Sequence, residues 1–204
     1  MFKYLFIVYI GLLILGLFQP LVGLFSALLF IVPVFILAPF SGRWWCAHLC
    51  PHGSFQDLFG LFVRNTMPSW LKSSWLRYGV LIISFSLWGY TLTALWGNWE
   101  ALGLAFTKLL WLSVIIGIFL MVVAPARSWC NICPMGTTAK LLAPKKAKLM
   151  ITTDCVYCRL CARVCPMGLS PYMDRGKAAG FTNPDCMRCG RCASFCFKHA
   201  IKVQ

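Results

Sequence analysis

The sequence predicts a membrane all-α bundle of four transmembrane helices, built from two repeated hairpins, followed by a small α+β domain. The chain is 60% hydrophobic and 12% charged over its 204 residues, whereas soluble domains have about 25% charged residues. Its apolar residues gather in four long segments, and from about residue 142 the chain becomes polar, basic and rich in cysteine. We therefore expect residues 1–141 to form the transmembrane domain and residues 142–204 a separate domain.

The four apolar segments have about the 20 residues that a membrane helix needs. They cover residues 2–18, 21–40, 78–96 and 106–123. The first two are separated by Gln19-Pro20, and proline ends a preceding helix while favouring the start of the next. Without a break they would form a helix of about 58 Å, nearly twice the thickness of the hydrocarbon core. We therefore predict a hairpin that turns at Gln19-Pro20.

Basic residues are distributed unevenly between the loops. The loop after the second segment holds Arg43, Arg64, Lys72 and Arg77, and the stretch after the fourth holds Arg127, Lys140, Lys145, Lys146 and Lys148. In the loop between the third and fourth segments, from Asn98 to Leu104, the one charged residue is Glu100. Lys and Arg favour the cytoplasmic side. The pattern predicts a multi-pass protein of the inner (cytoplasmic) membrane, with both termini in the cytoplasm. Residues 54–64 are expected to form a short helix, either interfacial or buried in the loop.

The membrane part contains an internal repeat. The stretch "APFSGRWWCAHLCPHGS" (residues 38–54) aligns with "APARSWCNICPMGT" (residues 124–137). Both share, in order, Ala-Pro, Arg, Trp-Cys, a second Cys, Pro, Gly and a hydroxyl residue, and each copy follows a pair of apolar segments. Two parallel repeats around an axis along the membrane normal would bring Cys46, Cys50, Cys130 and Cys133 together. Trp44, Trp45 and Trp129 are interpreted as members of an aromatic belt.

The C-terminal region carries two runs with the spacing C-x2-C-x2-C-x3-C, at residues 155–165 and 186–196. This spacing places three thiolates on one [4Fe–4S] cluster and sends the fourth to the other cluster. Cluster 1 would use Cys155, Cys158, Cys161 and Cys196, and cluster 2 would use Cys186, Cys189, Cys192 and Cys165. Zinc is the alternative, but structural zinc sites use well-separated C-x2-C pairs. "KLMITT" and "AIKV", on either side of the runs, are predicted to be short strands.

The motifs also limit the other chemistry that we expect. No histidine lies in an apolar segment, which argues against a haem inside the membrane, and no C-x-x-C-H is present for a c-type haem. No nucleic-acid-binding signature accompanies the net charge of +14, so we predict no nucleic acid partner. The pattern predicts a protein that carries electrons. Arg159, Arg163, Arg188 and Arg191 would raise the cluster potentials or dock an acidic partner, or form an ordinary solvated basic face.

The role of the four cysteines in the repeated motif stays open between three interpretations. The first is a third redox centre, iron–sulfur or another metal, at the membrane face. The second is a set of metal-free thiols, including a redox-active dithiol pair, and the third is a structural zinc site. His48 and His52 flank Cys50, and they are candidates for handling a quinone proton. The alternative is that each histidine bonds to a carbonyl at a helix end.

The C-terminal region resembles a bacterial two-cluster ferredoxin, with Phe197 where proline usually follows the second run. With "CAHLCP", "CNICP" and four apolar segments, the whole chain resembles the polyferredoxin-type membrane 4Fe-4S proteins. This family includes NapH, MauN and the C-terminal half of NosR, and it supplies quinol dehydrogenase membrane subunits. The family usually has C-x3-C-P twice, whereas the second copy here is C-x2-C-P.

The resemblance implies an integral membrane electron-transfer subunit that links the quinone pool to a partner redox protein within a larger oxidoreductase complex. One alternative is a conduit from a cytoplasmic reductant, such as a ferredoxin, to an extracytoplasmic flavin or iron–sulfur partner. Another is a metal reductase or assembly factor for a respiratory enzyme.

Overall fold

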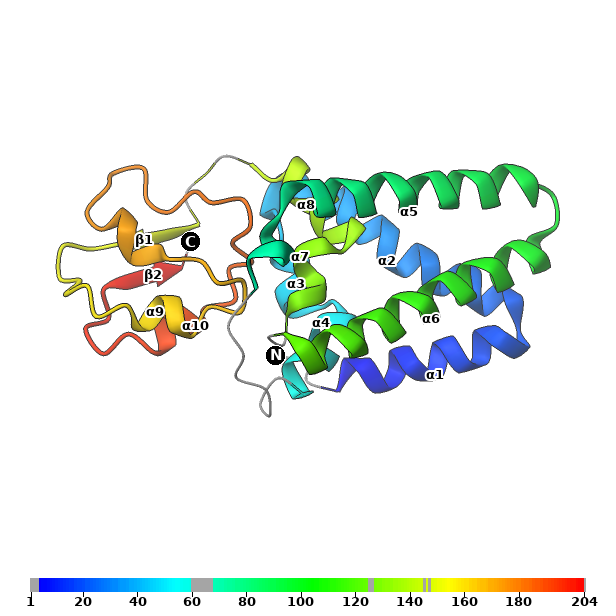
Figure 1. Cartoon of the computed structure of the whole chain (residues 1–204), viewed down its shortest axis with the longest axis horizontal. Coiled ribbons are helices and arrows are strands. Elements are labelled where there is room, and N and C mark those ends of the chain that lie inside the picture. The colour runs from blue at the N-terminus through cyan, green and yellow to red at the C-terminus, as the bar shows by residue number, and fades with distance from the viewer. Residues whose placement is uncertain (1–3, 60–67, 125–126, 145, 147, 204) are drawn as a thin grey trace.

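The computed structural model describes residues 4–59, 68–124, 127–144, 146 and 148–203. Four long helices lie side by side in a bundle, and a small cysteine-rich domain sits against one end of it (Figure 1). The bundle helices are α1 (Leu5–Phe18), α2 (Pro20–Ser41), α5 (Ser74–Ala94) and α6 (Trp99–Val123). Helices α2 and α6 pack along one another, while α1 packs on α2 and α6. The bundle is thus arranged around the α2–α6 pair.

The predicted hairpin at Gln19-Pro20 is confirmed. Helix α1 ends at Phe18, Gln19 is extended, and Pro20 is the first residue of α2, where its fixed φ favours helix initiation. The second hairpin turns more tightly than predicted. Helix α6 begins at Trp99, seven residues before the predicted Phe106, because Asn98 caps it by accepting a hydrogen bond from the Ala101 N–H. Residues 99–104, predicted to lie in a loop, are therefore helical.

Two helices in the described part of the chain are long and apolar enough to cross a membrane, by length and composition. They are Pro20–Ser41 and Trp99–Val122, which correspond to the second and fourth predicted segments. Helix α1, with 14 residues, is apolar but shorter. Helix α5 begins at Ser74, four residues earlier than predicted, and includes the buried Arg77 in its first turn.

Short helices follow each of the two central helices and close one end of the bundle. After α2 come α3 (Trp44–His48) and α4 (Pro51–Phe59), and after α6 come α7 (Ser128–Ile132) and α8 (Pro134–Leu142). Helix α4 overlaps the short helix predicted over residues 54–64, of which residues 60–64 lie outside the described residues. Helix α4 packs against α6, and α8 packs against α2. Each repeat therefore places its last helix against the central helix of the other repeat.

The C-terminal domain is built on a two-stranded antiparallel sheet, as predicted. Strand β1 (Leu149–Ile151) pairs with β2 (Ile201–Val203), with Leu149 opposite Val203. Single-turn helices α9 (Leu160–Arg163) and α10 (Arg191–Ser194) lie within the two cysteine runs, and each includes the third cysteine of its run. A core of Leu149, Ile151, Phe181 and Ile201 includes Cys161, Cys186 and Cys192. Three of the eight cysteines of this domain therefore lie in its core, while Cys158 is exposed.

Candidate cysteine site at the junction of the two domains

The two cysteine runs of the C-terminal domain adopt the same backbone turn. In each run, the residue before the middle cysteine and the residue after it have positive φ: Tyr157 and Arg159 in the first run, Arg188 and Gly190 in the second. Side chains other than Gly rarely adopt this conformation. Two left-handed residues in three positions curl the chain tightly, so that the thiols of one run turn toward a common centre.

The spacing of the two runs predicts two groups of four thiols, whose names are used below. The outer cysteine group is Cys155, Cys158, Cys161 and Cys196, and the inner cysteine group is Cys165, Cys186, Cys189 and Cys192. Burial, together with the charges of the neighbouring Cys189, Cys186 and Cys165, raises the pKa of Cys192 to about 12. Burial likewise raises the pKa of Cys161, with Cys155 and Cys158 adding to the effect. Crowded buried thiolates repel one another and need a positive centre to offset their charge. Four converging thiols are a donor set that fits an iron–sulfur cluster.

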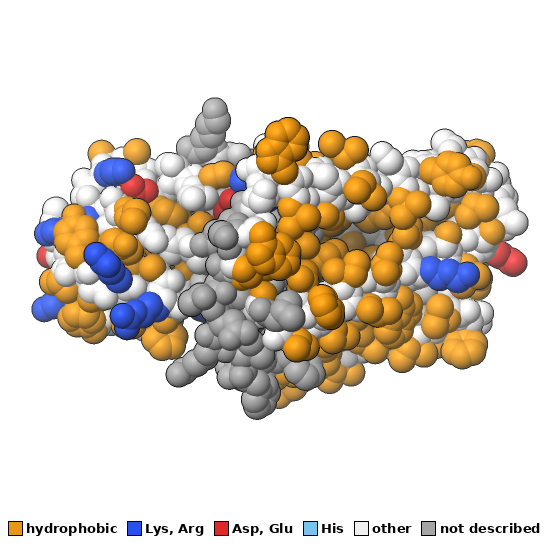
Figure 2. Space-filling model, viewed as in Figure 1, with side chains coloured by type: hydrophobic (Ala, Val, Ile, Leu, Met, Phe, Trp, Pro, Cys, Tyr) orange, Lys and Arg blue, Asp and Glu red, His pale blue; other side chains and the backbone are white. Residues whose placement is uncertain are grey.

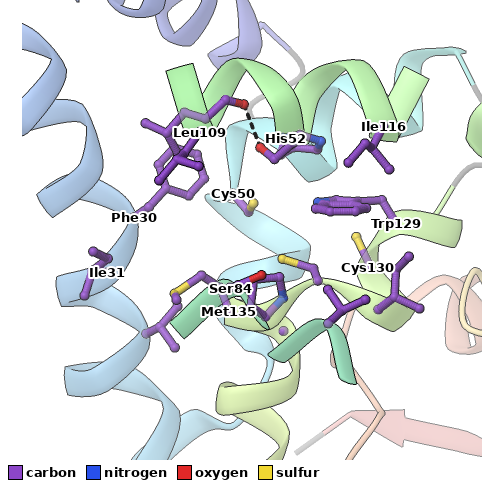
Figure 3. A pocket seen from close by; sticks show the side chains of 18 of the residues that line it. Phe30, Ile31, Cys50, His52, Ser84, Leu109, Ile116, Trp129, Cys130 and Met135 are labelled. Atoms are coloured by element: carbon purple, nitrogen blue, oxygen red, sulfur yellow. Dashed lines mark hydrogen bonds between the residues drawn. The ribbon is translucent and has the colours of Figure 1, made fainter. Parts of the chain in front are cut away.

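The four cysteines of the repeated motif, here called the bundle-end cysteines, also come together. Cys46, Cys50, Cys130 and Cys133 all line one cavity at the end of the bundle (Figure 3). Burial raises the pKa of Cys133 to about 12, an effect that the backbone N–H groups of Gly136 and Met135 partly offset. Burial also raises the pKa of Cys50, and Cys46 and Cys130 add to this, while the Gly53 N–H opposes it. The second cysteine of each motif thus lies beside the N–H groups that open α4 or α8, where negative charge is favoured.

The arginine of each motif reaches across to the other repeat. Arg43 donates to the carbonyl oxygen of Cys130, and Arg127 donates to the carbonyl oxygen of Cys46. Both arginine side chains are 1% exposed. The motif glycines make room for them. A Cβ on Gly136 would lie 2.9 Å from Arg43 Nη2, and one on Gly53 would lie 2.9 Å from Arg127 Nη1. The shared Arg, Cys and Gly of the repeat therefore form two reciprocal contacts that hold the motifs together.

Two carboxylates complete these contacts and join the bundle to the C-terminal domain. Asp57 accepts from Arg127 at 2.5 Å and from Arg191 of the C-terminal domain at 2.8 Å. Asp185 of the C-terminal domain accepts from Arg43 at 2.9 Å, Arg77 at 3.0 Å and Lys140 at 3.0 Å.

The charges around Asp185 outweigh the cost of its burial. Burial alone would raise the pKa of Asp185, but Arg43, Lys140 and Arg77 together hold it below its usual value. The interface between the two domains is thus fixed by buried or half-buried charges rather than by apolar packing alone.

The inner cysteine group is the one that touches the bundle-end cysteines. Cys46 and Cys130 belong to one buried cluster with Met167 and Met187, and Cys165 and Cys189 pack against it. Arg127 Nη1 also approaches Met187 Sδ at 3.7 Å. The chain therefore places its three cysteine groups in sequence: the outer group, whose Cys158 is exposed, then the inner group, then the bundle-end cysteines.

The two histidines of the first motif lie in different surroundings. His48 Nδ1 donates to the carbonyl of Trp44 at 3.1 Å, and its ring stacks on Trp44 at 4.5 Å. This is the helix-end carbonyl contact that was the alternative interpretation. His52 is buried and lines the cavity with the bundle-end cysteines, and burial lowers its pKa to about 4. Burial favours the neutral imidazole, in which one ring nitrogen donates a hydrogen bond and the other accepts one.

The interpretation of the tryptophans as an aromatic belt is wrong for Trp129. That ring is 7% exposed, lines the cavity, and lies 6.0 Å from the His52 ring. Trp45 also lines the cavity. Their place after the motif arginine puts them inside the bundle end, where they shield the thiols from water.

Across the described residues, no three His, Cys, Asp or Glu side chains converge closely enough to hold a single metal ion. The inorganic core of a [4Fe–4S] cluster is larger than one ion, so its four thiolates stand further apart. The choice between a redox centre, metal-free thiols and a structural zinc for the bundle-end cysteines therefore stays a matter for proposal.

Sequence reasoning missed the residues that connect the domains. Asp57, Asp185 and Arg77 carry no motif of their own. The sequence offered one general clue to the two aspartates, which is that acidic residues are few: the chain has five of them and nineteen basic residues. Two of these five are buried against arginines at the junction, where an unpaired cation would cost several kcal/mol.

The comparisons with known proteins match both parts of the chain. Residues 22–68 and 107–149 match a family described as a 4Fe-4S binding domain, and residues 147–197 match a family described as a 4Fe-4S dicluster domain. The first match falls on the two repeated segments and covers their cysteine motifs. The second covers both cysteine runs of the C-terminal domain.

Curated relatives share about a quarter to a third of their residues with the chain. It is 28% identical to the ferredoxin-type protein NapH of Escherichia coli, over 79% of this chain and 61% of that protein. It is 27% identical to the NapH of Haemophilus influenzae, over 83% and 64%. It is 30% identical to the methylamine utilization ferredoxin-type protein MauN of Methylobacillus flagellatus, over 62% and 49%. The chain thus spans less than two thirds of these relatives. No solved structure matches it significantly.

Proposed function

We propose that this chain, a polyferredoxin-type protein of the NapH and MauN kind, is the membrane subunit that passes electrons between the quinone pool and a partner redox protein. The NapH and MauN relatives are named as ferredoxin-type proteins, and the chain's own cysteine runs match a 4Fe-4S dicluster domain. In this proposal the chain works inside a larger oxidoreductase complex. It carries electrons and does not itself transform a carbon substrate.

One observation carries the proposal, which is the order of the three cysteine groups. The outer group has an exposed ligand, Cys158, where a soluble partner can approach. The inner group packs against the bundle-end cysteines through Met167 and Met187. The bundle-end cysteines line a cavity that enters the bundle. A series of neighbouring cofactor sites that runs from a water-exposed surface into an apolar bundle is what an electron wire to the membrane requires.

The outer and inner groups would each hold one [4Fe–4S] cluster, and the bundle-end cysteines would hold a third centre. When bound, these clusters supply one-electron transfer. The chain's own residues set the surroundings: Arg43 and Arg127 hold positive charge within the motifs, and both are buried. Positive charge beside a cluster favours its reduced form and raises its potential. The packing of the C-terminal domain over the motifs keeps water away from the bundle-end thiols.

The surface of the bundle supports a membrane location. Large apolar side chains face outward along all four long helices, including Ile7, Phe25, Ile83 and Phe119, each more than half exposed. Figure 2 shows apolar side chains covering this face of the bundle, while basic side chains gather on the C-terminal domain. A soluble monomer rarely exposes so much contiguous apolar surface. We propose that all four helices span the inner membrane, with the C-terminal domain and both termini in the cytoplasm.

Metal analysis of the full-length chain tests the third centre. Purified anaerobically, the wild type should carry about 12 iron and 12 sulfide per chain, as three [4Fe–4S] clusters require. The double variant Cys46→Ser/Cys130→Ser should fall to about 8 of each. The matched variant Cys158→Ser tests the outer group in the same way. A wild type with about 8 iron and unchanged content in the double variant would limit the chain to two clusters.

Titration with a reduced quinol tests the electron route. Quinol should reduce the clusters of the intact complex, followed by electron paramagnetic resonance under anaerobic conditions. Reduction by a ferredoxin but not by quinol would instead favour the conduit from a cytoplasmic reductant. Reduction of copper or iron salts by a chain that has no stable partner would favour the metal reductase or assembly role.

A further inference from the structure

The cavity beside the bundle-end cysteines continues deep between the long helices. It has a volume of about 330 Å³ and is lined by residues of α1, α2, α5 and α6 as well as by the motif helices. Binding sites for small molecules have volumes of about 300–1,000 Å³. Most of its wall is aliphatic or aromatic. The proposed third centre would occupy the end of this space among the bundle-end cysteines. The part between the long helices is left for a ligand, and it is too apolar for a strongly hydrated one.

The cavity opens sideways rather than toward water. Four of its lining residues are also exposed on the outer surface of the bundle: Ile83 and Leu87 of α5, and Leu112 and Ile116 of α6. Figure 2 shows a hollow in the apolar surface at this part of the bundle. In the proposed topology this opening faces the lipid tails. A ligand that enters here must dissolve in the membrane.

Among the described residues that line the cavity, the Tyr9 hydroxyl and Arg43 Nε have no hydrogen-bond partner. The Arg43 guanidinium is already engaged through its other two nitrogens, which leaves the Tyr9 hydroxyl as a wholly unpartnered side chain. Tyr9 of α1 is 3% exposed, lines the cavity, and its hydroxyl makes no hydrogen bond to any described residue. Its ring is held against Phe30 at 4.9 Å and packs with Leu13 and Val114. The hydroxyl lies within electrostatic reach of Cys50 and Cys133. Buried hydroxyls are nearly always hydrogen-bonded, because a buried hydroxyl without a partner loses the hydrogen bonds that it makes to water in the unfolded chain.

We propose that this cavity binds the ring of a quinone, with the Tyr9 hydroxyl donating a hydrogen bond to one ring oxygen. A lipid tail would fill the apolar space but would give the Tyr9 hydroxyl no hydrogen-bond partner. A ring carbonyl would accept a hydrogen bond from it. The isoprenoid tail leaves through the gap between α5 and α6. The inference rests on the proposed function, since it assigns a binding site to the quinone already invoked there. It also places the ring beside the bundle-end cysteines, next to His52 (Figure 3).

Two pairs of variants in the full-length chain test this assignment. Tyr9→Phe removes the hydroxyl, and Tyr4→Phe is its control, because Tyr4 is 70% exposed at the start of the same helix. Ser84→Phe fills the cavity from α5, and Ser86→Phe is its control, because Ser86 is exposed on that helix outside the cavity. The visible absorption of the clusters reports whether each variant has folded.

The measured quantity is the affinity for decylubiquinone, followed by quenching of tryptophan fluorescence, since Trp45, Trp88 and Trp129 line the cavity. Tyr9→Phe should weaken binding about tenfold, as expected for the loss of one hydrogen bond. Ser84→Phe should weaken it more than Tyr9→Phe does, and both controls should bind as the wild type does.

Equal binding by Tyr9→Phe and Tyr4→Phe, or by Ser84→Phe and Ser86→Phe, would overturn the assignment. The quinone site and the proposed function can also fail separately. Cluster reduction by quinol without loss in either cavity variant would place the quinone elsewhere and leave the function intact. Cavity-dependent binding without any cluster reduction would support the site and overturn the electron route to the quinone pool.

Discussion

The two cysteine motifs share one frame and differ in where they find their carboxylate. In both, an arginine crosses to the first cysteine carbonyl of the other motif, and a glycine makes room for it. Arg127 then pairs with Asp57, which lies in the first repeat. The position equivalent to Asp57 in the second repeat is Lys140, and Arg43 pairs instead with Asp185 of the C-terminal domain. The duplicated frame holds the thiols, and this one difference recruits the C-terminal domain.

The largest loss of stability should come from removing Asp185, the carboxylate that pairs with Arg43 because the second repeat has no counterpart of Asp57. Asp185→Asn would leave Arg43, Arg77 and Lys140 without a counter-charge, and breaking a buried pair costs about 3–5 kcal/mol. Asp57→Asn should cost less, because Arg191 is 35% exposed and can reach water. The unfolding temperature in detergent measures both.

Asp174→Asn serves as the control for these variants, since Asp174 pairs on the surface with Lys177, which is 61% exposed. Such a pair contributes about 0–1 kcal/mol. Equal losses for Asp57→Asn and Asp185→Asn would contradict the asymmetry between the two motifs.

Adding a methyl group to either motif glycine should cause a smaller loss of stability, and the loss should be similar for the two glycines. In Gly136→Ala the new Cβ would lie 2.9 Å from Arg43 Nη2 and 3.0 Å from the Cys130 oxygen. In Gly53→Ala it would lie 2.8 Å from the Cys46 oxygen. Each should cost about 1–3 kcal/mol, as overpacking does.

Gly89→Ala is the matched control, because a Cβ there would meet nothing within 4 Å. Its helix propensity should leave stability unchanged or improve it by about 1 kcal/mol. If one motif glycine tolerates alanine and the other does not, the two reciprocal contacts are not equivalent.

The smallest effect should come from His48→Gln. His48 caps its own helix through Trp44 and is not among the cavity-lining residues. The rate of cluster reduction by quinol should therefore stay within about twofold of the wild type, while stability falls by no more than about 1 kcal/mol. A severalfold loss of rate would return His48 to a role in proton transfer.

Local signals predicted the parts of the molecule that local chemistry determines. Gln19-Pro20 predicted the first hairpin because proline acts on its own neighbours, while the two cysteine groups of the C-terminal domain stay a prediction from the spacing. The repeat predicted that Cys46, Cys50, Cys130 and Cys133 lie together, which the structure shows. The start of α6 was missed because Asn98 caps it ahead of the apolar run.

The contacts between the domains could not be predicted in this way. Arg43 and Asp185 are 142 positions apart, and neither residue carries a local pattern that names the other. In the sequence, nothing distinguishes Tyr9 from the other aromatic residues of an apolar helix. Its unmet hydroxyl is visible only once Cys50 and Cys133 of distant segments have been brought to the same cavity.

The late position of Asp185 in the chain has a consequence for biogenesis. A ribosome completes all four long helices before it reaches residue 185, so Arg43, Arg77 and Lys140 emerge first without their counter-charge. In the proposed topology these free cations hold the newly inserted hairpins in their orientation. They are neutralised when the C-terminal domain folds and docks. The same side chains thus serve insertion while the chain is being made, and cohesion once it is complete.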